Sequence, residues 1–215
     1  MIRVKIQAEP ADFQTKVGKP GRDFLKICPN PTTEQYKGHD YWTHISKYLT
    51  RVYGHICAYT CHWISDDTGW NSVEHFEPKS IRPDLAYVWS NYRLVCGRLN
   101  GRRGIRQILD PFKLPDGPNG LFAVIFPSLE IVPRHGLDKA IRDEVQDTID
   151  VLNLNDEETC AAARFEYVRG YCLKHFKMAY LRKYAPFLAS EIARQNFVDP
   201  DELMVKMGGR FPPED

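Results

Sequence analysis

The chain has 215 residues, and its 29 Lys and Arg residues nearly balance 28 Asp and Glu residues, for a formal net charge of +1 at pH 7. This balance argues against general electrostatic adhesion to nucleic acid or membrane, so any anion-binding surface must be local. The longest apolar run, Leu121 to Phe126, is too short to cross a bilayer, and the first ten residues contain no signal-peptide core. We therefore expect a cytoplasmic protein with no membrane contact, whose six cysteines are thiols or metal ligands.

The first segment, residues 1–52, is predicted to be mostly helical. Apolar and polar residues alternate at 2–6, which predicts a short strand, and residues 10–21 predict one helical turn that ends at a Lys-Pro-Gly break. After a potential N-cap at Asp40, apolar residues recur at three- and four-residue steps, which predicts an amphipathic helix. These residues are Trp42, Ile45, Leu49 and Val52.

Residues 53–110 contain the residues that point most clearly to chemistry. Alternation from Ser72 to Glu77 ends at Pro78, which is a short strand pattern. Glu74 and His75 are neighbours there, so on a strand they point to opposite faces and can do different jobs.

The same segment predicts a second strand and a helix. Tyr92 to Val95 can form the strand, and Cys96 to Arg103 can form a short helix that carries Asn100. An acid and a histidine, then Asn91, then Asn100 before a Gly-Arg-Arg-Gly run therefore fall on a strand, loop, strand and helix.

This order resembles the HNH, or ββα-metal, endonucleases, over residues 53–110. The resemblance implies that His75 is the general base and that Asn91 tethers a loop whose carbonyl fixes the imidazole tautomer. It also implies that Glu74 and Asn100 bind one divalent cation, and their oxygen atoms suit Mg²⁺ or Mn²⁺. Because the third position of the motif is an asparagine, Asn100, the segment is most similar to variant HNH domains, including those of RNA-guided CRISPR effectors. The acid of the family is more often Asp, so Glu74 must reach one methylene further.

A structural zinc site is a second implication of the resemblance. The candidate ligands are Cys57, Cys61 and Cys96. Zinc prefers four tetrahedral ligands, and the fourth family cysteine is replaced by Leu99. Two readings stay open: a zinc site completed by His55 or His62, or a vestigial site whose thiols only pack.

Basic residues gather around the predicted helix. Residues 85–109 contain no acid, and guanidinium groups there can bind phosphates in a bidentate manner. The residues predicted to contact nucleic acid are Lys79, Arg98, Arg102, Arg103 and Arg106. The alternative for the arginines is a solvated helix face.

Residues 111–215 predict a β-hairpin followed by helices. Two strand-like runs surround Pro127-Ser128, and apolar periodicity then predicts one helix around 141–152, a second around 165–176 and shorter ones after Pro186 and Pro200. The complete prediction is an α+β fold, in which a ββα-metal core is embedded in a mostly helical single domain with an additional short hairpin.

The predicted function is metal-dependent hydrolysis of phosphodiester bonds in DNA, with RNA left open as a substrate. More weakly, the chain is similar to the HNH nuclease subunits of Septu-type and retron-associated anti-phage systems, which implies an ABC-type ATPase as partner. The alternatives are a nucleic-acid-binding subunit without turnover and a zinc-knuckle adaptor of a larger complex.

Overall fold

The structure is a computed structural model that describes residues 1–66, 70–117, 120–209 and 211. The chain divides into two compact units. One unit, called the ββα unit below, consists of Lys5–Ala58 and Ile64–Ile105. The other, called the C-terminal unit, consists of Met1–Val4, Tyr59–Trp63 and Arg106–Asp215. Helices and two small antiparallel sheets occur together, which confirms the α+β class.

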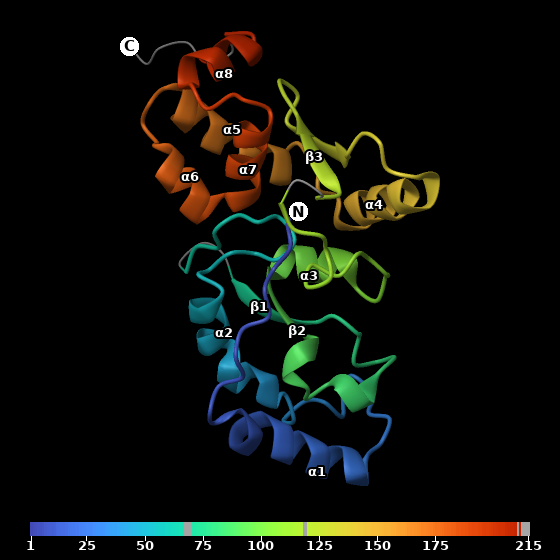
Figure 1. Ribbon diagram of the computed structural model, residues 1–215. Coiled ribbons are helices and arrows are strands. Elements are labelled where there is room, and N and C mark those ends of the chain that lie inside the picture. The colour runs from blue at the N-terminus through green and yellow to red at the C-terminus, as the bar shows by residue number, and fades with distance from the viewer. Residues whose placement is uncertain (67–69, 118–119, 210, 212–215) are drawn as a thin grey trace. The chain divides into compact units, whose positions relative to one another are not determined.

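The ββα unit begins with helical segments and ends with two strands and a helix (Figure 1). Its elements are η1 (Gln14–Gly18), α1 (Lys19–Ile27), η2 (Tyr41–Ile45), α2 (Ser46–Val52), β1 (Asn71–His75), η3 (Pro83–Leu85), η4 (Trp89–Asn91), β2 (Tyr92–Cys96) and α3 (Gly97–Arg103). The predicted order of strand, loop, strand and helix is therefore present at 71–103. The helix predicted after Asp40 is also present, although it begins with a 3₁₀ turn before it becomes α-helical at Ser46.

Two predictions for the N-terminal segment are wrong. Residues 2–6 form no strand, because the amide of Val4 bonds only the Pro111 carbonyl, at 2.9 Å, and no ladder forms. The Lys-Pro-Gly sequence begins α1 rather than ending a helix. The chain passes directly from η1 into α1 at this point, and Pro20 is the second residue of α1. Gly21 is required by packing, since a Cβ at this position would lie 2.0 Å from the Tyr87 ring.

Strands β1 and β2 pair in an antiparallel register that places Glu74 opposite Arg93 and His75 opposite Tyr92. Because these are the two strands of a two-stranded sheet, β1 has a second edge that no strand from the described residues covers. The connection between them, residues 76–91, begins and ends close together, since the Phe76 amide donates to the Asn91 carbonyl at 2.9 Å.

The C-terminal unit joins a hairpin to five helices among its described residues (Figure 1). Its elements are β3 (Phe122–Ile125), β4 (Glu130–Pro133), α4 (Lys139–Leu152), α5 (Cys160–Cys172), α6 (Met178–Tyr184), α7 (Pro186–Arg194) and α8 (Pro200–Lys206). The predicted hairpin and the helices around 141–152, around 165–176, after Pro186 and at Pro200 are confirmed. Helix α6 was not predicted, because its seven residues bury only Leu181 and show no apolar period.

Buried polar groups connect the elements of the C-terminal unit. The guanidinium of Arg164, only 1% exposed, donates to the carbonyls of Leu129 and Leu154 at 2.7 and 2.8 Å. It therefore joins the hairpin turn to the end of α4, and its own desolvation is offset by these bonds. Within the described part of the chain, no helix has both the length and the apolar character needed to cross a membrane.

Candidate active site

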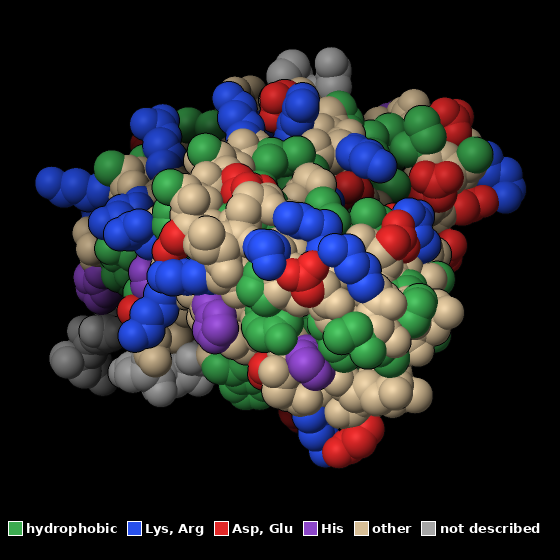
Figure 2. All heavy atoms as spheres, turned by 90° about the horizontal axis from the view of Figure 1, so that it is seen from below, with side chains coloured by type: hydrophobic (Ala, Val, Ile, Leu, Met, Phe, Trp, Pro, Cys, Tyr) green, Lys and Arg blue, Asp and Glu red, His purple; other side chains and the backbone are tan. Residues whose placement is uncertain are grey.

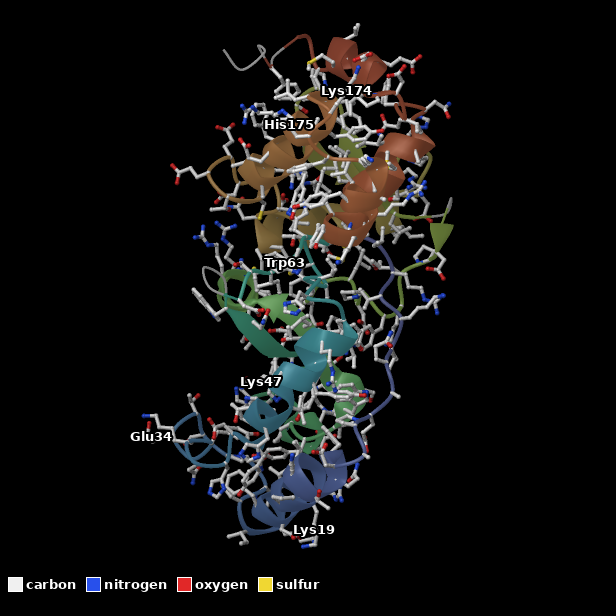
Figure 3. All side chains as sticks on the ribbon, turned by 90° about the vertical axis from the view of Figure 1, so that its left-hand side faces the viewer. Lys19, Glu34, Lys47, Trp63, Lys174 and His175 are labelled. Atoms are coloured by element: carbon white, nitrogen blue, oxygen red, sulfur yellow. The ribbon has the colours of Figure 1, made fainter. Side chains whose placement is uncertain are left out.

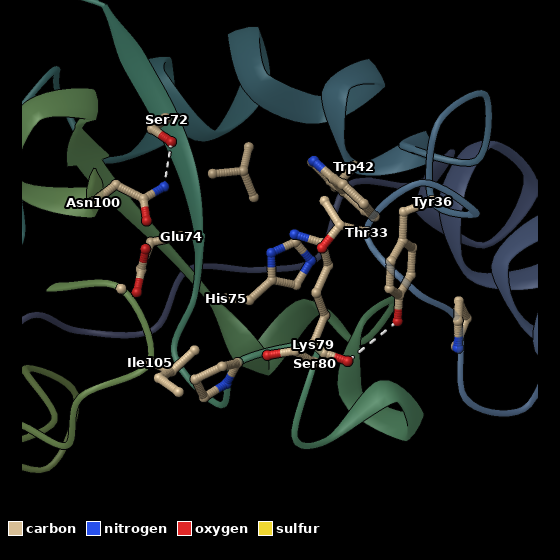
Figure 4. Close-up of a pocket in the computed structure, with 14 residues that line it drawn as sticks. Thr33, Tyr36, Trp42, Ser72, Glu74, His75, Lys79, Ser80, Asn100 and Ile105 are labelled. Atoms are coloured by element: carbon tan, nitrogen blue, oxygen red, sulfur yellow. Dashed lines mark hydrogen bonds between the residues drawn. The ribbon is translucent and has the colours of Figure 1, made fainter. Parts of the chain in front are cut away.

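The residues predicted to form the site come together in the ββα unit. Glu74, His75 and Asn100 line one cavity of about 320 Å³ (Figure 4). In this view Glu74 and His75 project from opposite sides of β1, as expected for neighbours on a strand. Both line the same cavity because the cavity lies along β1, where four consecutive residues, Ser72 to His75, form part of its wall. One edge of β1 is not paired with a strand of the described residues.

Asn91 is buried behind the cavity and holds the loop that follows β1. Its side-chain oxygen accepts from the Glu77 amide at 2.7 Å, and its nitrogen donates to the Glu77 carbonyl at 3.0 Å. The same nitrogen donates to the Leu85 carbonyl at 3.1 Å. One buried amide thus fixes both the start of the loop and the residue just before Ala86.

The Ala86 carbonyl determines which ring nitrogen of His75 carries the proton. Nε2 of His75 lies 3.0 Å from this oxygen, and a carbonyl can only accept, so Nε2 carries the proton. The Tyr92 hydroxyl donates to the same oxygen at 2.7 Å. A neutral imidazole in this tautomer has its lone pair on Nδ1, and the structure shows no hydrogen bond from the described residues to that atom.

The surroundings of His75 keep it neutral. The imidazole is 8% exposed, and burial, followed by the positive charge of Lys79, lowers its pKa to about 3. The rings of Trp42 and Tyr92 pack edge-on against it at centroid distances of 4.7 and 5.2 Å. At neutral pH the group is therefore a base that holds no proton on Nδ1, in an orientation fixed by three contacts.

Glu74 is 2% exposed and is paired with a buried arginine of α3. Arg103, fully buried, donates from Nη1 to Glu74 Oε1 and from Nη2 to the Phe76 carbonyl at 2.6 Å. The guanidinium also lies over the Phe76 ring, 4.8 Å from its centroid. A buried carboxylate is costly unless it is paired, so Arg103 stabilises the charge and fixes the Glu74 rotamer.

Asn100 contributes an amide oxygen from α3. Its nitrogen donates to Ser72 Oγ at 2.6 Å, and no bond to its oxygen is present among the described residues. In Figure 4 this oxygen turns toward the Glu74 carboxylate. One carboxylate and one amide oxygen on a cavity wall fit a hard cation such as Mg²⁺, which keeps several waters and takes few protein ligands.

The basic residues predicted to contact nucleic acid lie in different surroundings. Arg98 is exposed on α3, Arg102 is half-buried and Arg103 is inside the protein beside Glu74. Arg106 belongs to the C-terminal unit, where it donates to the Val151 carbonyl at 3.2 Å. On the face that Figure 2 shows, basic and acidic side chains are intermingled and no single charge type covers it.

The predicted zinc ligands are all thiols. Cys57 and Cys61 are buried and Cys96 is half-buried, while Leu99, where a fourth ligand was expected, is a core residue at 1% exposure. Across the described ranges, no group of three or more His, Cys, Asp or Glu residues is arranged to hold a metal ion. The zinc site stays a prediction.

The structure adds residues to the site that the sequence did not indicate. Tyr36 and Trp42 line the cavity from the N-terminal segment, beside Lys79, which was already predicted to contact nucleic acid. The periodicity of residues 42–52 identified Trp42 only as part of an apolar helix face, because nothing in the local pattern indicates which neighbour that face meets. Tyr92 could have been found only through the strand register, which places it opposite His75.

No family model matches the chain. The chain is similar to the Septu protein PtuB of Bacillus thuringiensis, with 26% identity over 106 residues. The matched part makes up 48% of this chain and 37% of that protein, so the chain covers little more than a third of the length of this relative.

Proposed function

We propose that this chain is a metal-dependent endonuclease of the HNH type that hydrolyses phosphodiester bonds in DNA. One observation carries the proposal: one cavity is lined by Glu74, His75 and Asn100, and His75 Nδ1 is unprotonated there. Glu74 and His75 are on opposite faces of one strand, and Asn100 is distant from both in the sequence. An unprotonated imidazole nitrogen, a carboxylate and an amide oxygen on one cavity wall support the proposal, because metal-assisted hydrolysis requires a base and oxygen ligands.

His75 would act as the general base. Nδ1 takes a proton from the attacking water as the water oxygen forms a bond to phosphorus and the bond to the leaving oxygen breaks. A correctly placed base contributes about 10²–10⁴-fold to such a rate. Asn91 acts at a distance, because it holds the loop whose Ala86 carbonyl keeps the proton on Nε2.

Glu74 and Asn100 would hold Mg²⁺ or Mn²⁺. A cation bound there supplies charge neutralisation for the phosphate and the leaving oxygen. Arg103 pairs with Glu74 and orients its carboxylate from the protein side. Arg98 and Arg102, on α3, are the candidates for holding the DNA backbone.

The test is cleavage of supercoiled plasmid in Mg²⁺ or Mn²⁺ by the wild-type protein and two histidine variants. His75→Ala should lower the rate by about 10²–10⁴-fold, as expected for loss of a general base. His44→Ala, which removes an exposed imidazole of the same unit, should cleave like the wild type. Equal cleavage by His75→Ala and wild type would reject His75 as the base.

A role in anti-phage defence is the wider proposal, and the similarity to Septu protein PtuB supports it. In such a system the chain would act beside an ABC-type ATPase, with the helices of the C-terminal unit as the docking surface. Co-purification with an ABC-type ATPase, and protection of cells against phage that depends on His75, would support the proposal. Equal protection by the His75→Ala variant would contradict it.

The Glu74–Arg103 pair favours a second function. The arginine neutralises much of the carboxylate charge, and a less negative site attracts a cation less strongly. The second candidate is therefore a nucleic-acid-binding subunit without turnover. It predicts DNA retention that depends on Arg98 and Arg102, together with no cleavage in either metal.

A further inference from the structure

Lys79 has unusual surroundings for a lysine. It is half-buried just after β1, and it forms no ion pair with a carboxylate among the described residues. Nζ instead lies over two aromatic rings, 5.1 Å from the Trp42 centroid and 5.5 Å from the Tyr36 centroid. Ring faces attract a cation but do not neutralise its charge, so the ammonium can still bind an anion.

The same rings connect Lys79 with the base. Trp42 packs edge-on against His75 at 4.7 Å, and the Tyr36 hydroxyl donates to the Lys79 carbonyl at 3.3 Å. In Figure 4, Lys79, His75 and Trp42 lie on one side of the cavity, while Glu74, Asn100 and Ser72 lie on the other. An anion inside this cavity would therefore meet the ammonium on one side and the oxygen ligands on the other.

We propose that Lys79 is a further catalytic residue, whose ammonium binds a non-bridging oxygen of the scissile phosphate and stabilises the charge that develops there in the transition state. Trp42 and Tyr36 are the positioning residues that hold the ammonium toward the cavity. The inference rests on the proposed nuclease function. Lys79 forms and breaks no covalent bond in this role and transfers no proton, because the water proton goes to His75.

A partly desolvated, oriented cation stabilises a developing anion more than a solvated lysine can. The surrounding rings exclude water from one side of the ammonium, which strengthens its electrostatic effect inside the cavity. Because the side chain is already held in place, little reorganisation is required when charge develops. A surface lysine that only attracts the DNA backbone would instead change affinity and salt dependence.

The test compares single-turnover cleavage of a plasmid in Mg²⁺ with duplex DNA affinity measured in Ca²⁺. Lys79→Ala should lower the cleavage rate by about 10²–10³-fold, a loss typical of removing one oriented electrostatic group. The DNA affinity should change by less than about threefold, since one phosphate contact among many is lost. Lys47→Ala, which removes an exposed lysine of α2, should cleave and bind like the wild type (Figure 3).

Chemical rescue separates a catalytic ammonium from a structural one. Ethylammonium chloride should restore part of the rate to Lys79→Ala, whereas sodium chloride at the same ionic strength should not. Trp42→Phe should retain more activity than Trp42→Leu, because phenylalanine keeps a ring face for the ammonium. Thermal unfolding checks that each variant is folded, and Lys79→Met, which keeps the apolar stem, replaces Lys79→Ala if that variant is not.

The outcomes distinguish this inference from the proposed function. A wild-type protein that does not cleave DNA in either metal would remove both. A wild-type protein that cleaves, together with Lys79 variants that cleave equally fast, would overturn only the role of Lys79. Equal losses of rate and affinity, without rescue by ethylammonium, would also overturn it, because they would show an ordinary backbone contact.

Discussion

Each compact unit buries one histidine and one glutamate among its described residues, and the surroundings of the two sets differ. Burial lowers the pKa of both His62, in the C-terminal unit, and His75, in the ββα unit, to about 3. His62 packs against the Tyr167 ring at 5.3 Å, whereas His75 has one nitrogen fixed by Ala86 and lines a cavity with two oxygen ligands. A lowered pKa therefore reports burial, and the contacts identify the site.

The two buried glutamates make the same point. Glu191 is bonded on both oxygens, by Arg134 and Arg194 side chains and by the Val124 amide at 3.0 Å. These bonds join α7 to the hairpin, which is a structural task. Glu74 is also paired with an arginine, but it shares its cavity with an imidazole and an amide oxygen.

The largest expected effect distinguishes the two glutamates by activity. Glu74→Gln should lower plasmid cleavage at least about a hundredfold, because a correctly held metal supplies several kcal/mol of transition-state stabilisation. Glu191→Gln should leave the rate per folded molecule unchanged. Single-turnover cleavage, corrected for the folded fraction from circular dichroism, measures both. Equal losses in the two variants would remove the distinction between site and scaffold.

Glu191 should matter for the stability of the fold rather than for cleavage. Glu191→Ala leaves two arginines without their buried partner and should lower the free energy of unfolding by about 3 kcal/mol. Urea unfolding measures this change. The matched control is Asp143→Ala, because its ion pair with Lys139 is solvent-exposed and should contribute nothing measurable. A Glu191→Ala midpoint within error of the wild type would contradict the structural role.

A smaller effect is expected at the start of α4. The Asp138 carboxylate accepts from the Ile141 amide at 2.9 Å and satisfies one of the unpaired donors of the helix. Asp138→Ala should lower the free energy of unfolding by about 1 kcal/mol, with no change in cleavage rate. Asp138→Asn should retain most of the stability, since asparagine is an equally good cap. Equal destabilisation by both variants would indicate another role for this residue.

The sequence predicted what depends on local pattern. Alternation up to Pro78 predicted β1, apolar periodicity predicted α4, and the resemblance selected Glu74, His75, Asn91 and Asn100, which the structure gathers around one cavity and its loop. The strand predicted at 2–6 fails because no partner strand pairs with it, and partners are set by tertiary structure.

The remaining features of the site depend on packing between distant segments. Trp42 meets His75, and Arg103 pairs with Glu74 across 29 positions, although its sequence context suggested a phosphate contact. Nothing in a run of arginines indicates which one points inward. Arg98 and Arg103 lie on the same short helix, and only its orientation against β1 buries the second and exposes the first.

The most direct test of the account measures Mn²⁺ binding by electron paramagnetic resonance. It compares the wild-type protein with Glu74→Gln, Asn100→Ala and His75→Ala. If Glu74 and Asn100 hold one divalent cation beside the base, the wild type and His75→Ala should each bind one Mn²⁺. The Glu74 and Asn100 variants should bind at least about tenfold more weakly, as is typical for disturbed metal coordination. The same affinity in all four proteins would contradict the central claim.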